Sequence, residues 1–201
     1  MVIGLTGAIG AGKSTVAQYF ALAGYNVADC DAVSRGINGD EQYVAAVKKA
    51  FGRDAVTLSD GKEYVDRQAL ARIVFSESGA RKKLESISHP MILERVRESI
   101  NSAAKLGMDT VVDAPLLFES GFDAECDVTV GVVAEEDVRI GRAVLRGGIS
   151  RESIIARIAV QPKTEFYREK CDIIIENNGS EAELKEKFEQ TLALLAERRG
   201  I

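Results

Sequence analysis

Gly7-Ala8-Ile9-Gly10-Ala11-Gly12-Lys13-Ser14 follows the pattern G-x-x-x-x-G-K-S, and the sequence on both sides suits it. An apolar run over residues 2–6 precedes the stretch, and a helical pattern over residues 15–22 follows it. Glycines leave room for backbone amides to converge on phosphate oxygens, and the start of a helix adds further donors and a partial positive charge. The stretch therefore predicts a phosphate-binding loop between a buried strand and a helix, in a protein that binds a nucleoside triphosphate.

Two side chains of this loop have expected tasks. The Lys13 ammonium would reach the β- and γ-phosphates of the nucleotide. The Ser14 hydroxyl would complete the coordination shell of a Mg²⁺ ion.

Length, composition and charge exclude several classes of protein. The 201 residues suit one α/β domain, and the hydrophobic content of 46% supplies a sizeable core. A formal net charge of −5 argues against non-specific nucleic-acid binding, which depends on neutralising phosphates with Lys and Arg. Cys30, Cys126 and Cys171 lack C-x-x-C spacing, so we expect reduced thiols rather than a disulfide frame or a zinc site.

No apolar run approaches the roughly 18 residues of a membrane span, and the first expected strand leaves no room for a signal peptide. We therefore expect a soluble, cytoplasmic protein without membrane or nucleic-acid partners, either a monomer or a weak homo-oligomer.

Strand-like apolar runs alternate with helical patterns, which is typical of a parallel sheet with crossover helices. The runs cover residues 2–6, 26–29, 109–113, 127–133 and 172–175. We expect an α/β, three-layer fold of the P-loop NTPase type, with a five-stranded parallel sheet, a helical substrate-binding insertion and a helical lid. One domain over residues 1–201 would then have its core at about 1–31, 108–134 and 171–201.

The expected insertion, about residues 32–107, is predicted to be mostly helical. Helical patterns cover residues 41–51, 67–75 and 77–88, and Pro90 suits the first turn of a further helix that runs to about residue 106. Such an insertion could hold a second substrate, or it could be additional scaffold.

The expected lid, about residues 135–170, is helical and rich in arginine, with Gly147-Gly148 as a hinge. Arg142 and Arg146 lie four residues apart, so one helical face could present both to a transferring phosphoryl group. Alternatively they form a solvated face paired with Glu135 or Glu136. Arg139 is a weaker candidate that we expect to be simply exposed.

The remaining sequence favours a kinase over other phosphate-loop proteins. There is no N-K-x-D sequence for guanine and no L-S-G-G-Q run of a transporter ATPase. The run Thr110–Asp113 continues into Ala114-Pro115, without the Asp-Glu pair of a water-activating ATPase. A kinase needs a carboxylate only to orient its acceptor hydroxyl, and Asp31, after the second strand, could do so or bind Mg²⁺ through water. Alternatively, Asp31 caps the helix that starts at Ala32; Asp29 is a weaker candidate.

Taken together, these features resemble the dephospho-coenzyme A kinase family nearly from end to end. The blocks that carry the resemblance are Gly4–Ala17, Asp29-Cys30-Asp31, Phe51-Gly52, Asp66-Arg67 with Leu70, Ile73-Val74-Phe75, Leu84-Glu85, His89-Pro90, Pro115-Leu116-Leu117-Phe118-Glu119, Arg142, Arg146, Arg157, Gln161 and Asp172 with Asn177-Asn178-Gly179. The most specific block is Pro115–Glu119, because few other phosphate-loop kinases place P-L-L-F-E after the third strand.

The resemblance implies transfer of the γ-phosphoryl group of ATP to the ribose 3′-hydroxyl of dephospho-coenzyme A, with Mg²⁺ as cofactor. This is the last step of coenzyme A synthesis. The expected catalytic residues are Lys13, Asp31 and Arg142. The expected ATP-binding residues are Gly7, Ala8, Ile9, Gly10, Ala11, Gly12, Lys13, Ser14, Thr15, Val16, Arg146 and Asn177. The expected acceptor-binding residues are Asp31, Arg67, His89, Leu116 and Arg157, and the expected metal ligands are Ser14 and Asp113.

Several of these roles have structural alternatives. His89 could be a helix cap or a core histidine, Asp113 could make a purely structural hydrogen bond, and Asn177 could serve only the Asn-Asn-Gly turn. Two other functions also remain: a different small-molecule kinase, for nucleosides, nucleoside monophosphates or shikimate, and a non-catalytic nucleotide sensor. Turnover of ATP that depends on dephospho-coenzyme A would separate the three.

Overall fold

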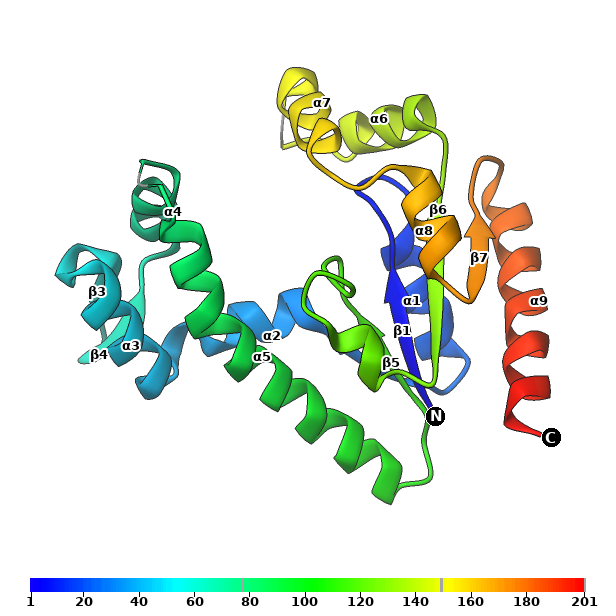
Figure 1. The fold of residues 1–201 in the computed structure, drawn as a ribbon, viewed down its shortest axis with the longest axis horizontal. Coiled ribbons are helices and arrows are strands. Elements are labelled where there is room, and N and C mark those ends of the chain that lie inside the picture. Colours follow the sequence, from blue (N-terminus) through cyan, green and yellow to red (C-terminus); the bar gives the residue numbers. More distant parts are fainter. Residues whose placement is uncertain (77, 149, 201) are drawn as a thin grey trace. The chain divides into compact units, whose positions relative to one another are not determined.

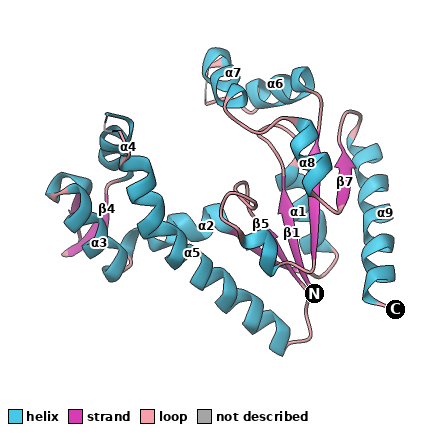
Figure 2. Cartoon of the chain, viewed as in Figure 1, coloured by secondary structure: helices cyan, strands magenta, loops and turns pink. Residues whose placement is uncertain are grey.

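The computed structural model describes residues 1–76, 78–148 and 150–200 of the chain (Figures 1 and 2). The chain forms two compact units. The first consists of Met1–Ala28 with Ile100–Ile201, and the second of Asp29–Ser99. Each unit is described by itself.

The first unit is built on a five-stranded sheet with the strand order β2-β5-β1-β6-β7. The strands are β1 (Val2–Thr6), β2 (Asn26–Asp29), β5 (Thr110–Asp113), β6 (Val128–Val133) and β7 (Ile173–Glu176). β1 pairs in parallel with both β5 and β6, and β6 pairs in parallel with β7. The expected five-stranded parallel sheet is thus confirmed, with strand ends within one residue of those expected.

Helices of the first unit accompany this sheet. They are α1 (Lys13–Leu22), α6 (Glu136–Leu145), α7 (Arg151–Ala159), α8 (Thr164–Lys170) and α9 (Glu181–Arg199), with a short 3-10 turn at Phe122–Glu125. The core joins α1, the strands and α9, and the rings of Phe20 and Phe188 meet edge to face at 4.8 Å. Figure 1 shows α9 alongside β7, and α6 and α7 beyond the carboxyl ends of β1 and β6.

The second unit is mainly helical. It contains α2 (Cys30–Gly36), a 3-10 turn at Ile37–Gly39, α3 (Glu41–Phe51), a 3-10 turn at Arg53–Ala55, β3 (Val56–Ser59), β4 (Lys62–Val65), α4 (Arg67–Ser76) and most of α5 (Ala80–Lys105). Its own core gathers Ile37, Tyr43, Val44, Val47, Ala55, Val65 and Leu70. This unit therefore has a hydrophobic core separate from that of the sheet.

The prediction of a mostly helical region did not include one hairpin. β3 and β4 pair antiparallel around Asp60-Gly61, where both residues have positive φ, 50° and 75°. Asp-Gly is a strong hairpin signal. Leu58 is 69% exposed, so the strands lack the regular apolar face that marks a strand in sequence.

Pro90 does not begin a helix, contrary to the sequence-based expectation. It lies inside α5, which is continuous from Ala80 to Lys105, and residue 77 of the expected 77–88 helix lies outside the described residues. A proline removes one helical hydrogen bond and crowds the preceding turn. Apolar side chains on both sides of Pro90, among them Ile87 and Met91, pack on the core of the second unit and hold the helix together.

In the part of the chain that the structure describes, every helix is too short or too polar to cross a membrane.

Candidate active site

The segment between β1 and α1 has the geometry of an anion cradle. Gly12 caps α1 in the left-handed conformation, at φ 98°, and no side chain caps this end of the helix. The amides of Thr15 and Val16 turn back to the Gly12 carbonyl, at 3.0 and 3.2 Å. The first amides of a helix have no acceptor within the helix, so those of Lys13 and Ser14 are placed to bind an anion.

Lys13, the first residue of α1, forms an ion pair with Asp113. Asp113 is the last residue of β5 and lies beside Leu5 of β1, which brings its carboxylate next to the loop. The two side chains are only 15% and 9% exposed. The ammonium is therefore held at the mouth of the loop, where a bound phosphate would compete with Asp113 for it.

The oxygen donors beside Lys13 suit a Mg²⁺ ion. Ser14 offers a hydroxyl and Asp113 a carboxylate, and oxygen ligands are those that Mg²⁺ prefers. Among the described residues, no three His, Cys, Asp or Glu side chains gather into a metal cluster. The residues present thus fit an ion that takes its other ligands from phosphates and water, as Mg²⁺ commonly does.

Arg142 and Arg146, the two arginines of the expected lid, reach different parts of the site. Arg146 donates to the Ser14 hydroxyl at 3.3 Å. Arg142 donates to the Asn177 carbonyl at 2.6 Å, to the Asn177 Oδ1 at 3.2 Å and to the Gly179 carbonyl at 3.1 Å. Arg146 thus approaches the phosphate loop itself, while Arg142 fixes the exit from β7.

Asn177 connects the segment after β7 to the phosphate loop. Its side chain is buried, and its Nδ2 donates to the Ala11 carbonyl at 2.8 Å while its Oδ1 accepts from Arg142. Both ends of the amide are therefore engaged within the protein. A Cβ on Gly12 would collide with the same Nδ2, so Asn177 lies against the loop at the position that only glycine leaves open.

Gly12→Ala is expected to destabilise the protein more than Gly24→Ala. Both glycines have positive φ, 98° and 90°, but a Cβ at Gly24 meets open space. Backbone strain alone costs about 1–3 kcal/mol, and only Gly12→Ala must also displace Asn177. Denaturant unfolding of both variants measures the difference, and equal losses of unfolding free energy would contradict the packing of Asn177 on the loop.

Arg139 is buried, at 4% exposure, and the expectation that it is simply exposed is wrong. Its Nε donates to the Ile9 carbonyl at 3.0 Å, and its Nη2 donates to Gln161 Oε1 at 3.4 Å. Burial lowers the pKa of its guanidinium. A sequence signal existed, because Arg139 precedes Arg142 by three residues and so shares a helix face with it.

A cavity of about 500 Å³ opens beside the loop. Its lining includes apolar groups from Ile9, Ala143, Ile154 and Leu184, and polar groups from Gln18, Arg142, Arg146, Asn177 and Glu181. A mixed cavity next to an anion cradle can accept a planar base whose phosphates extend into the loop.

In the second unit, Asp31 is not a helix cap. The cap of α2 is Asp29, which accepts from the Ala32 amide at 3.0 Å. Asp31 lies in the first turn of α2 with an exposed side chain. The alternative that Asp31 caps this helix is therefore wrong. Asp29 is the capping residue instead.

The other expected acceptor residues are dispersed over three helices and the segment after β5. Arg67 is the exposed first residue of α4, and His89 lies within α5 rather than at a helix start, which excludes the cap alternative. Leu116 follows β5 and is 41% exposed, and Arg157 is exposed on α7. Direct contacts join three pairs of expected site residues: Lys13 with Asp113, Ser14 with Arg146, and Arg142 with Asn177.

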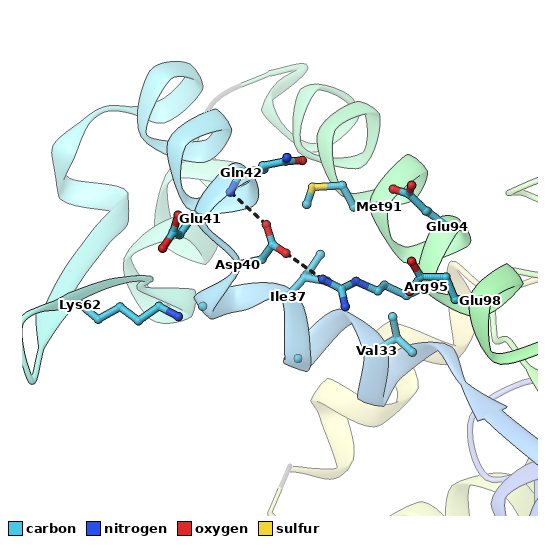
Figure 3. A pocket seen from close by; sticks show the side chains of 12 residues that line it. Val33, Ile37, Asp40, Glu41, Gln42, Lys62, Met91, Glu94, Arg95 and Glu98 are labelled. Atoms are coloured by element: carbon cyan, nitrogen blue, oxygen red, sulfur yellow. Dashed lines mark hydrogen bonds and ion pairs between the residues drawn. The ribbon is translucent and has the colours of Figure 1, made fainter. Parts of the chain in front are cut away.

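The second unit has a pocket of its own, of about 910 Å³ (Figure 3). Asp40 caps α3 there and pairs with Arg95 at 2.9 Å. Val33, Ile37 and Met91 add apolar surface, and Lys62, Glu41, Glu94 and Glu98 add charge. The sequence suggested that this insertion could hold a second substrate. It did not predict which residues line a pocket, because the lining comes from several separate elements.

Comparison with known proteins identifies relatives over most of the chain. A family model described as "Dephospho-CoA kinase" matches residues 1–183. A dephospho-CoA kinase of Fusobacterium nucleatum is 34% identical over 190 residues, which is 94% of this chain and 96% of the relative. One of Mycolicibacterium paratuberculosis is 40% identical over 191 residues, where this chain spans only 46% of the relative. The crystal structure of TT1252 from Thermus thermophilus superposes with a TM-score of 0.80, at 34% identity and 97% coverage of both chains.

Proposed function

The chain belongs to the dephospho-coenzyme A kinase family, the phosphotransferases of the final step of coenzyme A synthesis, and we propose that it carries out this step with ATP as the donor. The observation that carries the proposal is the phosphate loop, with its uncapped helix start and the Lys13–Asp113 pair at its mouth.

In this proposal the loop, residues 7–16, holds the triphosphate of ATP. Backbone amides surround the phosphates, and Lys13 exchanges its contact with Asp113 for one with the β- and γ-phosphates. Arg146, which already approaches Ser14, would stabilise charge on the transferring group, and Arg142 would do so from the neighbouring turn of α6. The base of ATP would occupy the 500 Å³ cavity beside the loop, which Asn177 lines.

A divalent metal accompanies ATP in such kinases, and we propose Mg²⁺ as that ion. Ser14 and Asp113 would hold it, with Asp113 acting through water. When bound, the ion neutralises charge on the phosphates.

On the acceptor side, Asp31 would orient and deprotonate the 3′-hydroxyl of the ribose. Arg67, His89, Leu116 and Arg157 would contact the rest of dephospho-coenzyme A. The pocket at Asp40 and Arg95 combines apolar and charged surface, which suits a long acceptor with amide and hydroxyl groups. In this arrangement residues 32–107 are the acceptor-binding insertion, residues 135–170 are the lid, and the rest is the core.

The proposal also includes a compartment and an oligomeric state. The thiols of Cys30, Cys126 and Cys171 suit the reducing cytoplasm. We propose a monomer or a weak homo-oligomer.

The direct test is an assay with purified protein, Mg²⁺ and γ-labelled ATP. Label is expected to appear on the 3′-oxygen of dephospho-coenzyme A, and ADP is expected to form only when this acceptor is present. Shikimate, a nucleoside and a nucleoside monophosphate serve as control acceptors. Transfer to any of these instead would indicate a different small-molecule kinase, and ATP binding without transfer would indicate a nucleotide sensor.

A further inference from the structure

Ile9 joins the phosphate loop to the helices that follow β6. The motif leaves this position open, yet all three parts of the residue are engaged. Its side chain packs on a buried cluster of Ile140, Ile154 and Ile158 from α6 and α7. Its amide donates to Gln161 Oε1 at 3.0 Å, and its carbonyl accepts from Arg139 Nε at 3.0 Å.

These contacts of Ile9 fix the direction of the next amide in the loop. The Ile9 carbonyl and the Gly10 N–H belong to one planar trans peptide, so they point in opposite directions. Because Arg139 holds the carbonyl, the Gly10 N–H points away from the guanidinium. A rotated peptide would instead turn the carbonyl oxygen in the direction that the N–H now takes, and an oxygen would repel an anion there.

Close packing at Gly10 supports the same arrangement. Gly10 has φ 78°, and a Cβ there would collide with the backbone carbonyl of Arg139. The backbone of α6 therefore lies directly against the loop at this point. The loop and α6 are in contact through both backbone and side chain.

Burying the Arg139 guanidinium costs free energy. Its side chain is buried, and its two acceptors, a backbone carbonyl and an amide oxygen, are both uncharged. Burial of a charge without a carboxylate in direct contact is unfavourable unless several hydrogen bonds compensate it. A leucine at this position would pack without this penalty. The hydrogen bond to the Ile9 carbonyl therefore explains why an arginine is found here.

We propose that Arg139 and Gln161 are positioning residues. Arg139 holds the Ile9–Gly10 peptide through the Ile9 carbonyl, with the Gly10 N–H directed at the phosphates of bound ATP, and Gln161 holds the preceding Ala8–Ile9 peptide through the Ile9 N–H and also accepts from Arg139. Through them, the helices of residues 136–170 set the anion-binding form of the loop. The proposal rests on the proposed function in one respect, since it requires a triphosphate in the loop.

The test compares the affinities of ATP and adenosine for Arg139→Met and for the wild type, by calorimetry with Mg²⁺ present. Loss of a charge-assisted hydrogen bond is expected to weaken ATP binding by about tenfold or more. Adenosine lacks phosphates, so its affinity is expected to stay within about twofold of the wild-type value. Arg168→Met is the matched control, because Arg168 pairs with Glu176 at the surface and such pairs contribute little.

A pair of variants at Gln161 covers the case in which Arg139→Met does not fold. Gln161→Glu keeps an acceptor for both the Ile9 amide and Arg139, and Arg139 offsets its added negative charge, so it is expected to weaken ATP binding less than Gln161→Met does. Gln161→Met loses that acceptor and is expected to weaken ATP binding selectively.

Equal weakening of ATP and adenosine, or unchanged ATP affinity, would overturn the positioning role. In either case a wild-type enzyme that binds and transfers phosphate leaves the proposed function intact. A wild type that binds no ATP would contradict the proposed function itself.

Discussion

Lys13→Met is expected to lower the turnover of dephospho-coenzyme A phosphorylation by about 10²- to 10³-fold, the scale of losing one preorganised charge at a transition state. The substitution keeps most of the unbranched side chain and removes the ammonium that would bind the β- and γ-phosphates. The chain is expected to stay folded, with a lower melting temperature, because Asp113 loses its ion pair but retains a further interaction.

The measurement is the steady-state rate at saturating ATP and acceptor, beside a thermal melting curve. Lys187→Met is a suitable control, since Lys187 is also partly buried in the first unit and donates to the Glu176 carbonyl at 2.7 Å. Its turnover is expected to be close to the wild-type value. Wild-type turnover in a folded Lys13→Met protein would remove the assignment of the phosphate loop to catalysis.

Asp31→Asn is expected to lower turnover by about 10²-fold or more, the scale of general-base assistance. The replacement is isosteric but can no longer accept the proton of the 3′-hydroxyl. Stability is expected to change little: Asp31 is exposed and does not cap α2, so it loses only a favourable charge near the helix start, about 0.3–1 kcal/mol.

Asp29→Asn supplies the matched control two residues away. Asparagine caps helices as well as aspartate does, so the contact with the Ala32 amide is kept, and turnover and melting temperature are both expected to stay near wild type. The informative result is the contrast between the two variants in the same assay. If Asp31→Asn were fully active while Asp29→Asn was impaired, the general base would have to be reassigned to Asp29.

The sequence alone was sufficient for the sheet and its phosphate loop. Strand, loop and helix are contiguous there, so local apolar periodicity and the glycine spacing carry all the information needed. The same holds for α3, expected at residues 41–51, whose acidic start and apolar stripe are local features. Local signals failed at the β3–β4 hairpin, which is short and exposed, and at Pro90, where packing outweighs the proline.

The partners of the site residues required the tertiary structure. Lys13 meets Asp113 across 100 residues, Ile9 meets Gln161 across 152, and Asn177 meets Ala11 across 166. Periodicity within one helix suggested a face for Arg142 and Arg146, but it could not show that Arg139 on the same helix is buried against the loop. The sequence by itself thus determined the elements and the chemistry available at the loop. Which side chains hold the loop in its anion-binding form was decided by the tertiary structure, because burial and hydrogen bonding depend on segments that meet only when the sheet assembles.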